Sequence, residues 1–133
     1  MTGGKGSFQF KKGMSRTLKV IQTESEILVT PTIDGKQNTN KFQLDGTKGI
    51  YISSGGVRGE GTARFKGKSL TLDTFITTRP QPNGPDVQIH TQERWELSSD
   101  SRTLTIRSDV DFPGSPLGGF QLIEPWSEIY SRQ

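Results

Sequence analysis

QERWELSSDSRTLTIRSDVDF, residues 92–112, contains two runs of alternating apolar residues joined by a short polar segment. Trp95 and Leu97 precede the SSDS segment, and Leu104 and Ile106 follow it. Alternation with a period of two is typical of strands that bury one face. The stretch therefore predicts a β-hairpin, and the rest of the chain decides which kind of sheet it joins.

Similar strand signals recur every eight to twelve residues or so along the chain. The predicted strands cover residues 16–23, 25–33, 40–44, 49–53, 62–67, 69–78, 87–97, 102–112 and 120–132. Asp34-Gly35 and Asp45-Gly46 are hairpin turn signals because both residue types tolerate positive φ. Short connections favour antiparallel pairing of consecutive strands, and closure of the sheet removes its two exposed edges. We therefore expect an all-β, antiparallel up-and-down β-barrel of about 8–10 strands, with a two-sheet sandwich as the alternative.

The composition sets limits on the organisation of the chain and its chemistry. Its 133 residues fit a single domain, 1–133, in which we expect residues 1–15 to be a loosely ordered segment before the first strand. A hydrophobic content of 29% suits strands with one wet face. The absence of cysteine excludes disulfides, thiolate metal sites and thiol catalysis. No apolar run reaches the roughly 18 residues of a membrane-spanning helix, and MTGGKGSFQFKKG has no apolar core of a signal peptide.

Charge and titratable residues give few signs of a metal, cofactor or nucleic-acid site. The net charge is +3, and the basic residues are scattered, which indicates a solvated surface. His90 is the only histidine and falls on the outer face of its predicted strand. Asp109 and Asp111 alternate on an outer face without the loop spacing of a calcium site. We expect no metal, no cofactor and no nucleic-acid partner.

The hairpin sequence also resembles a known family. WELSSDSRTLTI is similar to the W-x-L-S-x-D-G-x-T-L-T motif of small bacterial lipocalin-like β-barrel proteins of the acidobacterial type, with Ser101 standing where the family has Gly. KGSFQF, FQLDG and EIYSRQ resemble further segments of these proteins in the same order. The resemblance implies a lipocalin-like barrel, a small and largely apolar ligand, and a secreted or periplasmic location. The sequence itself leaves the compartment and the oligomeric state unknown.

Alternation along each strand identifies the side chains that face the lumen. The predicted ligand-binding residues are Ile52, Phe65, Leu72, Thr74, Ile76, Ile89, Thr91, Glu93, Trp95, Ile106, Ser108 and Leu122. Two carboxylates, Glu93 and Glu124, fall on this face and are candidate acid/base groups or polar anchors. A bulge near Pro125, or a position at the wet mouth, is the alternative explanation for such carboxylates.

Two loops are candidate lids over the barrel mouth. The glycine-rich segment 53–61 contains Arg58, which could meet an anionic ligand, and the proline-rich segment 79–86 is the longest connection. An ordinary flexible hairpin loop is the simpler interpretation of both. The glycine-rich segment lacks the Gly-Lys-Ser/Thr sequence of a phosphate-binding loop.

Three functions fit this pattern. The leading one is binding of a small, largely apolar or amphipathic molecule in a partly empty lumen. The second is an enzyme of the cyclase, isomerase or hydrolase type, in which Glu93 and Glu124 converge in one cavity. The third is an interaction module whose lumen is filled by Phe65, Trp95, Trp126 and leucine side chains.

Overall fold

The computed structural model describes residues 6–79, 82–113 and 124–133, which form eleven strands in one antiparallel sheet. The strands are β1 Gly6–Lys12, β2 Arg16–Gln22, β3 Glu26–Ile33, β4 Lys36–Gln37, β5 Asn40–Gln43, β6 Gly49–Ile52, β7 Arg58–Lys66, β8 Ser69–Thr78, β9 Val87–Leu97, β10 Thr103–Asp111 and β11 Trp126–Arg132. Over the described ranges there is no helix that could cross a membrane.

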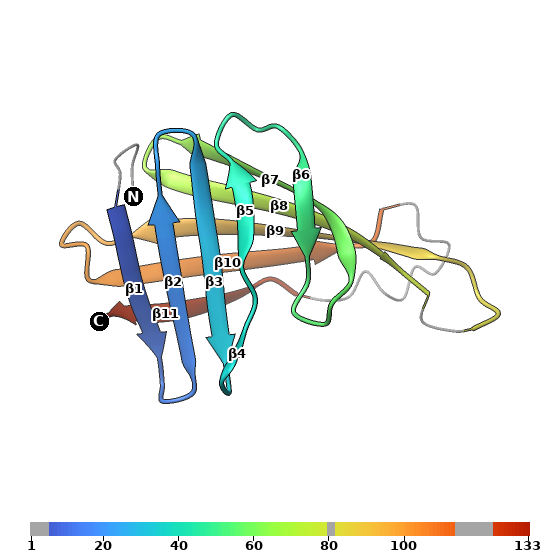
Figure 1. Cartoon of the computed structure of the whole chain (residues 1–133), viewed down its shortest axis with the longest axis horizontal. Helices are drawn as coiled ribbons and strands as arrows, with labels where there is room; N and C mark the ends of the chain where they lie inside the picture. Colours follow the sequence, from blue (N-terminus) through green and yellow to red (C-terminus); the bar gives the residue numbers. More distant parts are fainter. Residues whose placement is uncertain (1–5, 80–81, 114–123) are drawn as a thin grey trace.

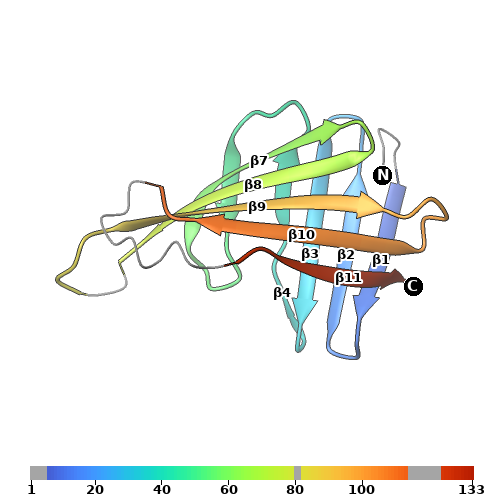
Figure 2. The same cartoon turned by 180° about the vertical axis from the view of Figure 1, so that it is seen from behind.

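The sheet curls into a flattened barrel of two layers. Its strand order is β4-β3-β2-β1-β11-β10-β9-β8-β7-β6, and β5 adds to β3. β1, β2, β3, β5 and β6 form one layer, and β7 to β11 cross behind them (Figure 1, and from behind Figure 2). The predicted all-β antiparallel barrel is confirmed, and the lumen lies between these two layers.

The β9–β10 hairpin has the register that the alternation predicted. Leu97 pairs with Leu104, and Trp95 pairs with Ile106. The turn is held by the side chain of Asp100, which accepts hydrogen bonds from Ser98 Oγ at 2.6 Å and Arg102 N at 3.1 Å. Ser101 has φ of 61°, in the left-handed region that glycine adopts without steric cost.

The first strand was missed in the sequence. Gly6–Lys12, expected to be loosely ordered, is β1, and it pairs with β2 along its whole length and with β11 through Phe10 and Lys11. The alternating Phe8 and Phe10 carried this signal, but the surrounding glycines and lysines obscured it. β1 therefore links β2 to β11 within the sheet, and its own Phe10 is buried in the core.

Of the two predicted turns, only Asp34-Gly35 forms a tight hairpin. Both residues have positive φ, and β3 pairs with β4 across them. Asp45-Gly46 does not join a paired hairpin, because no ladder connects β5 to β6. The prediction that all consecutive strands pair is therefore wrong at this position.

We call this break between β5 and β6 the seam, and side chains close it. Asn40 Oδ1 accepts from Ile52 N at 2.9 Å, and Asn40 Nδ2 donates to Ile52 O at 2.8 Å. Asn40 thus offers Ile52 the same pair of bonds that a neighbouring strand offers. Phe42 packs over Gly61, where a Cβ atom would lie 2.7 Å from the Phe42 ring.

Most of the buried core comes from the predicted inward faces, but Phe10 and Tyr130 were not among them, and Ile50, predicted to face inward, is exposed. It comprises Phe10, Leu18, Val20, Ile27, Val29, Phe42, Ala63, Leu70, Leu72, Trp95, Leu104, Ile106 and Tyr130. Trp95 is its largest fully buried side chain and is 1% exposed, whereas Trp126 is 41% exposed. Trp126 therefore does not fill the lumen as the interaction-module hypothesis required.

Candidate functional site

A cavity of about 220 Å³ lies between the two layers of the barrel. Its apolar lining consists of Leu18, Val29, Pro31, Ile33, Phe42, Leu72, Trp95 and Ile106. Its polar lining consists of Asn38, Asn40, Tyr51, Ser54, Thr74, Thr91, Glu93, Glu128 and Tyr130. The volume lies below the roughly 300–1,000 Å³ that is usual for drug-sized ligands, so the cavity suits a compact molecule.

Glu93 is a partly buried carboxylate on the cavity wall. It lies in the middle of β9, opposite Leu72 of β8 and Ser108 of β10, and its Oε1 accepts from Trp95 Nε1 at 3.1 Å. Burial raises the pKa of the Glu93 carboxyl, and the charge of Glu128 adds to the rise, while the Trp95 hydrogen bond opposes it. In the described part of the chain no lysine, arginine or histidine forms an ion pair with Glu93.

Glu128 of β11 also lines the cavity, but it is surrounded by donors. Its Oε2 accepts from Arg16 Nη1 at 3.0 Å and from Lys12 Nζ and Tyr130 Oη, each at 3.3 Å. Burial by itself would raise the pKa of the Glu128 carboxyl, but the contacts with Lys12, Trp126 and Arg16 outweigh burial and lower it. Glu128 therefore stays ionised with its charge compensated.

The neutral polar groups of the lining lie close to these acids. Burial and then Glu128 raise the pKa of Tyr130 to about 12. Burial and then the charge of Glu93 raise the pKa of Tyr51. Thr74 and Thr91 pair directly across β8 and β9, and both residues line the cavity.

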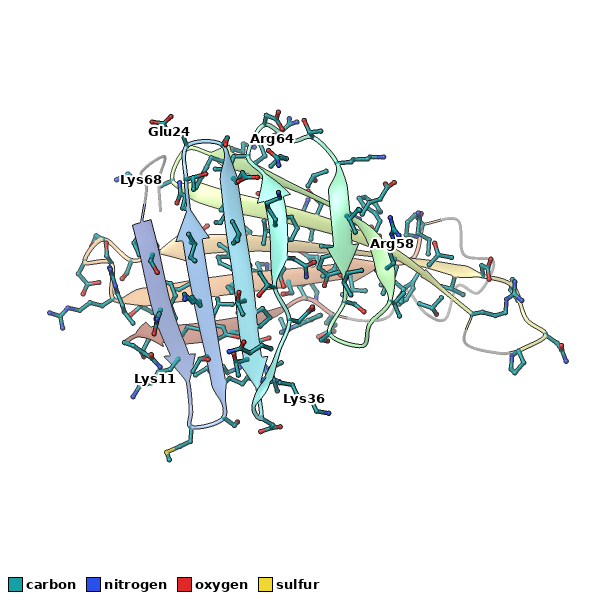
Figure 3. The ribbon with its side chains drawn as sticks, viewed as in Figure 1. Lys11, Glu24, Lys36, Arg58, Arg64 and Lys68 are labelled. Carbon is teal, nitrogen blue, oxygen red and sulfur yellow. The ribbon has the colours of Figure 1, made fainter. Side chains whose placement is uncertain are left out.

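The cavity adjoins a second hollow beside the β3–β4 hairpin. This hollow of about 320 Å³ shares Pro31, Ile33, Asn38 and Ser54 with the cavity. These residues lie at the end of β3, just after β4 and in the turn after β6. Lys36 marks the tip of the β3–β4 hairpin beside this hollow (Figure 3). The hollow thus lies between this hairpin and the β6–β7 turn.

Six of the twelve predicted ligand-binding residues line the cavity: Leu72, Thr74, Thr91, Glu93, Trp95 and Ile106. Phe65 instead packs against the core, Ser108 is buried, and the backbone of Ile52 takes part in the seam. Ile76 and Ile89 pair with each other near the far end of the β8–β9 hairpin, which extends beyond the front layer (Figure 1). Leu122 lies outside the described residues.

The predicted inward position of Glu124 is wrong. Glu124 is exposed and precedes β11, which begins only at Trp126. The carboxylate that reaches the cavity from this strand is Glu128. The predicted inward residues of this strand ended at Trp126. Continuing the same alternation by two and four residues would have identified Glu128 and Tyr130.

The lid hypothesis for Arg58 is also not supported by its position. Residues 58–61 belong to β7, and Arg58 is exposed at the start of this strand, beside β6 (Figure 3). Only Ser53 to Val57 form the connection, a tight turn in which Ser53 N donates to Val57 O at 2.9 Å. In the second predicted lid, Arg79 and Asp86 form a 3.0 Å ion pair, and none of the described residues of this loop lines the cavity.

His90 faces outward as predicted, but it has partners. Its Nε2 lies 2.8 Å from Asp73 Oδ1, its Nδ1 lies 3.2 Å from Asp111 Oδ1, and its ring stacks on Phe75 at 4.4 Å. The cluster ties β8, β9 and β10 together on the outer surface. No group of three or more potential metal ligands occurs among the described residues.

Comparison with known proteins shows the fold. No protein-family model matches the sequence, and no curated protein matches it. Among solved structures, the chain is similar to the REP1-NXSQ fatty acid transporter, with a TM-score of 0.63, 12% identity, and coverage of 97% of this chain and 95% of that one. It is also similar to a "secretary abundant heat soluble (SAHS) protein" from Ramazzottius varieornatus, with a TM-score of 0.64, 10% identity, and coverage of 100% and 97%. A third is apo lipid binding protein 8 of Caenorhabditis elegans, with a TM-score of 0.58, 10% identity, and coverage of 97% and 94%.

Proposed function

We propose that this protein binds a small, largely apolar molecule in the lumen of its barrel. The observation that carries the proposal is the cavity of about 220 Å³, whose wall combines apolar side chains with polar side chains that face the same space. Two of the similar structures are named as a fatty acid transporter and a lipid binding protein, which supports a hydrophobic ligand for this barrel.

Affinity would come mainly from the apolar part of the lining. Burying ligand surface yields roughly 25 cal/mol per Å², and the contacts would be made by Leu72, Ile106 and Trp95. Thr74, Thr91 and Glu93 would fix the orientation of the ligand. The small volume favours a short or compact molecule over a long acyl chain.

The resemblance of WELSSDSRTLTI also remains our basis for proposing kinship with the acidobacterial-type barrel proteins. The left-handed φ of Ser101 is consistent with this, because the family's glycine at that position would adopt it freely.

Native mass spectrometry of the purified protein, followed by solvent extraction, tests the proposal. We expect a fraction of the protein to carry a small molecule whose apolar character can be read from the extract. A mass of the chain alone, together with no binding of an environment-sensitive dye, would contradict lumenal binding and favour an interaction module.

Acid/base catalysis in the same cavity is the second candidate. It is favoured by one observation: Glu93 and Glu128 line one cavity with pKa values shifted in opposite directions. The ion pairs of Glu128 with Arg16 and Lys12 weigh against it, because they make Glu128 a poor proton acceptor. Glu93→Gln separates the two, since an enzyme would lose its rate by orders of magnitude and a binding protein only part of its affinity.

A further inference from the structure

The cavity is acidic. Its titratable lining consists of Glu93, Glu128, Tyr51 and Tyr130, and within the described residues no lysine, arginine or histidine lines it. A ligand carrying a negative charge would meet two carboxyl groups on the wall, and the cations beside them, Lys12 and Arg16, are already paired with Glu128.

The two carboxylates are not equivalent towards a ligand. Glu128 is already saturated by Lys12, Arg16 and Tyr130. Glu93 accepts one hydrogen bond, from Trp95, and its second oxygen has no partner in the described part of the chain. A buried carboxylate without a counter-charge is costly to the fold, so Glu93 is the group that gains most from a cationic partner.

We propose that the ligand is an amphiphilic amine, a compact apolar body with an ammonium group that binds at Glu93; this deepens, and rests on, the lumenal binding proposed above. An ammonium supplies the missing positive charge and three N–H donors. Besides Glu93, the hydroxyl of Thr91 on the same face of β9 offers an acceptor. The apolar body then contacts Leu72 and Ile106.

A carboxylic acid could compete by sharing a proton with Glu93. This arrangement leaves a negative charge near that of Glu128, which already acts on Glu93. Like charges in a low-dielectric site repel strongly, so the cavity favours the amine. The acid is therefore the informative competitor in the experiment.

Calorimetric titration with octylamine, octanol and octanoate tests the proposal, because the three share one alkyl chain and differ in the head group. The proteins are the wild type, Glu93→Gln and the control Glu96→Gln. Glu96 lies on the same strand but on the exposed outer face, paired with Arg94 at 3.1 Å, so both variants change the net charge equally.

We expect the wild type to bind octylamine at least about tenfold more tightly than octanol, and octanoate most weakly. Glu93→Gln should weaken octylamine binding by about tenfold to a hundredfold, since a hydrogen bond to a charged group is lost, and leave octanol within about twofold. Glu96→Gln should behave like the wild type.

Each other outcome overturns a defined part of the account. If none of the three compounds binds, the proposed lumenal function itself is wrong. If octanol or octanoate binds as tightly as octylamine, lumenal binding stands and the amine preference is wrong. If the amine is preferred but Glu93→Gln binds it normally, the assignment to Glu93 is wrong. The ligand comparison on the wild type stands even where a variant does not fold.

Discussion

Trp95 donates its indole N–H to the carboxylate of Glu93, two residues earlier on β9, at a distance of 3.1 Å. Residues two apart on a strand share a face, so both side chains lie on the wall of the same cavity. Trp95 gives Glu93 only one donor, whereas Glu128 receives bonds from several. This contrast makes Glu93 the polar group of the cavity that is open to a ligand.

Glu93→Gln should stabilise the ligand-free protein at neutral pH. Because burial raises the pKa of Glu93, the folded state binds its proton more tightly than the unfolded state does. This tighter proton binding stabilises the folded state below the ordinary pKa of 4.5. The stabilisation is lost as the pH rises through the raised pKa of Glu93. The free energy of unfolding of the variant should therefore match the wild type in acid and exceed it above this window.

Urea denaturation at a series of pH values measures this difference, with Glu96→Gln as the exposed control. A variant that is less stable than the wild type at neutral pH would show that the ionised Glu93 is already compensated in the ligand-free protein.

Glu128→Gln should have the opposite effect. The hydrogen-bond donors around Glu128 lower its pKa. The ionised carboxylate therefore stabilises the folded state above the ordinary pKa of 4.5, and this stabilisation is lost as the pH falls through the lowered pKa. We expect a loss of about 1 kcal/mol at neutral pH, modest because Lys12 and Arg16 are partly solvated. Urea denaturation over the same pH series measures this loss of unfolding free energy. A loss that stays the same in acid would contradict the role given to Glu128.

Ser101→Gly should stabilise the β9–β10 hairpin. Ser101 has φ of 61°, a conformation that costs an L-residue roughly 1–2 kcal/mol. Part of the gain is offset by the greater freedom of glycine in the unfolded chain, so the net increase in unfolding free energy should be about 0.5–1 kcal/mol. Ser99→Gly in the same turn, where φ is not positive, is the matched control and should give no increase. Equal effects of the two substitutions would contradict the account.

Asn40→Ala should open the seam. It removes both bonds to the backbone of Ile52 and leaves the Ile52 N–H without its acceptor, at a cost of about 1–3 kcal/mol. Asn38→Ala removes only one of two donors to Ile52 O and should cost less. Hydrogen exchange at the Ile52 amide is the local measurement. Unchanged protection in Asn40→Ala would mean that the side chain does not close the barrel.

Local alternation predicted much of the fold. The strands 69–78 and 87–97 were predicted with the bounds that the structure has, because their connections contain clear turn residues. β1 was missed because its two phenylalanines lie among lysines and glycines. The break at the seam was missed because the side chain of Asn40 takes the place of a neighbouring strand there. The alternation of apolar residues cannot reveal such a side-chain contact.

The site was predicted less completely for a geometric reason. Alternation tells which face a side chain takes but not how far along the barrel it lies, so Ile76 and Ile89 were included although they lie near the far end of the hairpin. Glu124 was placed inward because the start of β11 could not be located. Glu93 was correctly placed on the inner face, because its strand is unbroken on both sides.

The indole N–H resonance of Trp95 offers the most direct test that a ligand binds beside Glu93. The protein has two tryptophans, and Trp126 is largely exposed, so Trp126→Phe assigns the two indole signals of a ¹⁵N-labelled sample. We predict that octylamine shifts the Trp95 signal in a saturable manner, shifts the Trp126 signal, whose N–H contacts Glu128, by much less, and has a much weaker effect in Glu93→Gln. A Trp95 signal that does not move as octylamine is added, or that moves equally in Glu93→Gln, would contradict ligand binding at Glu93.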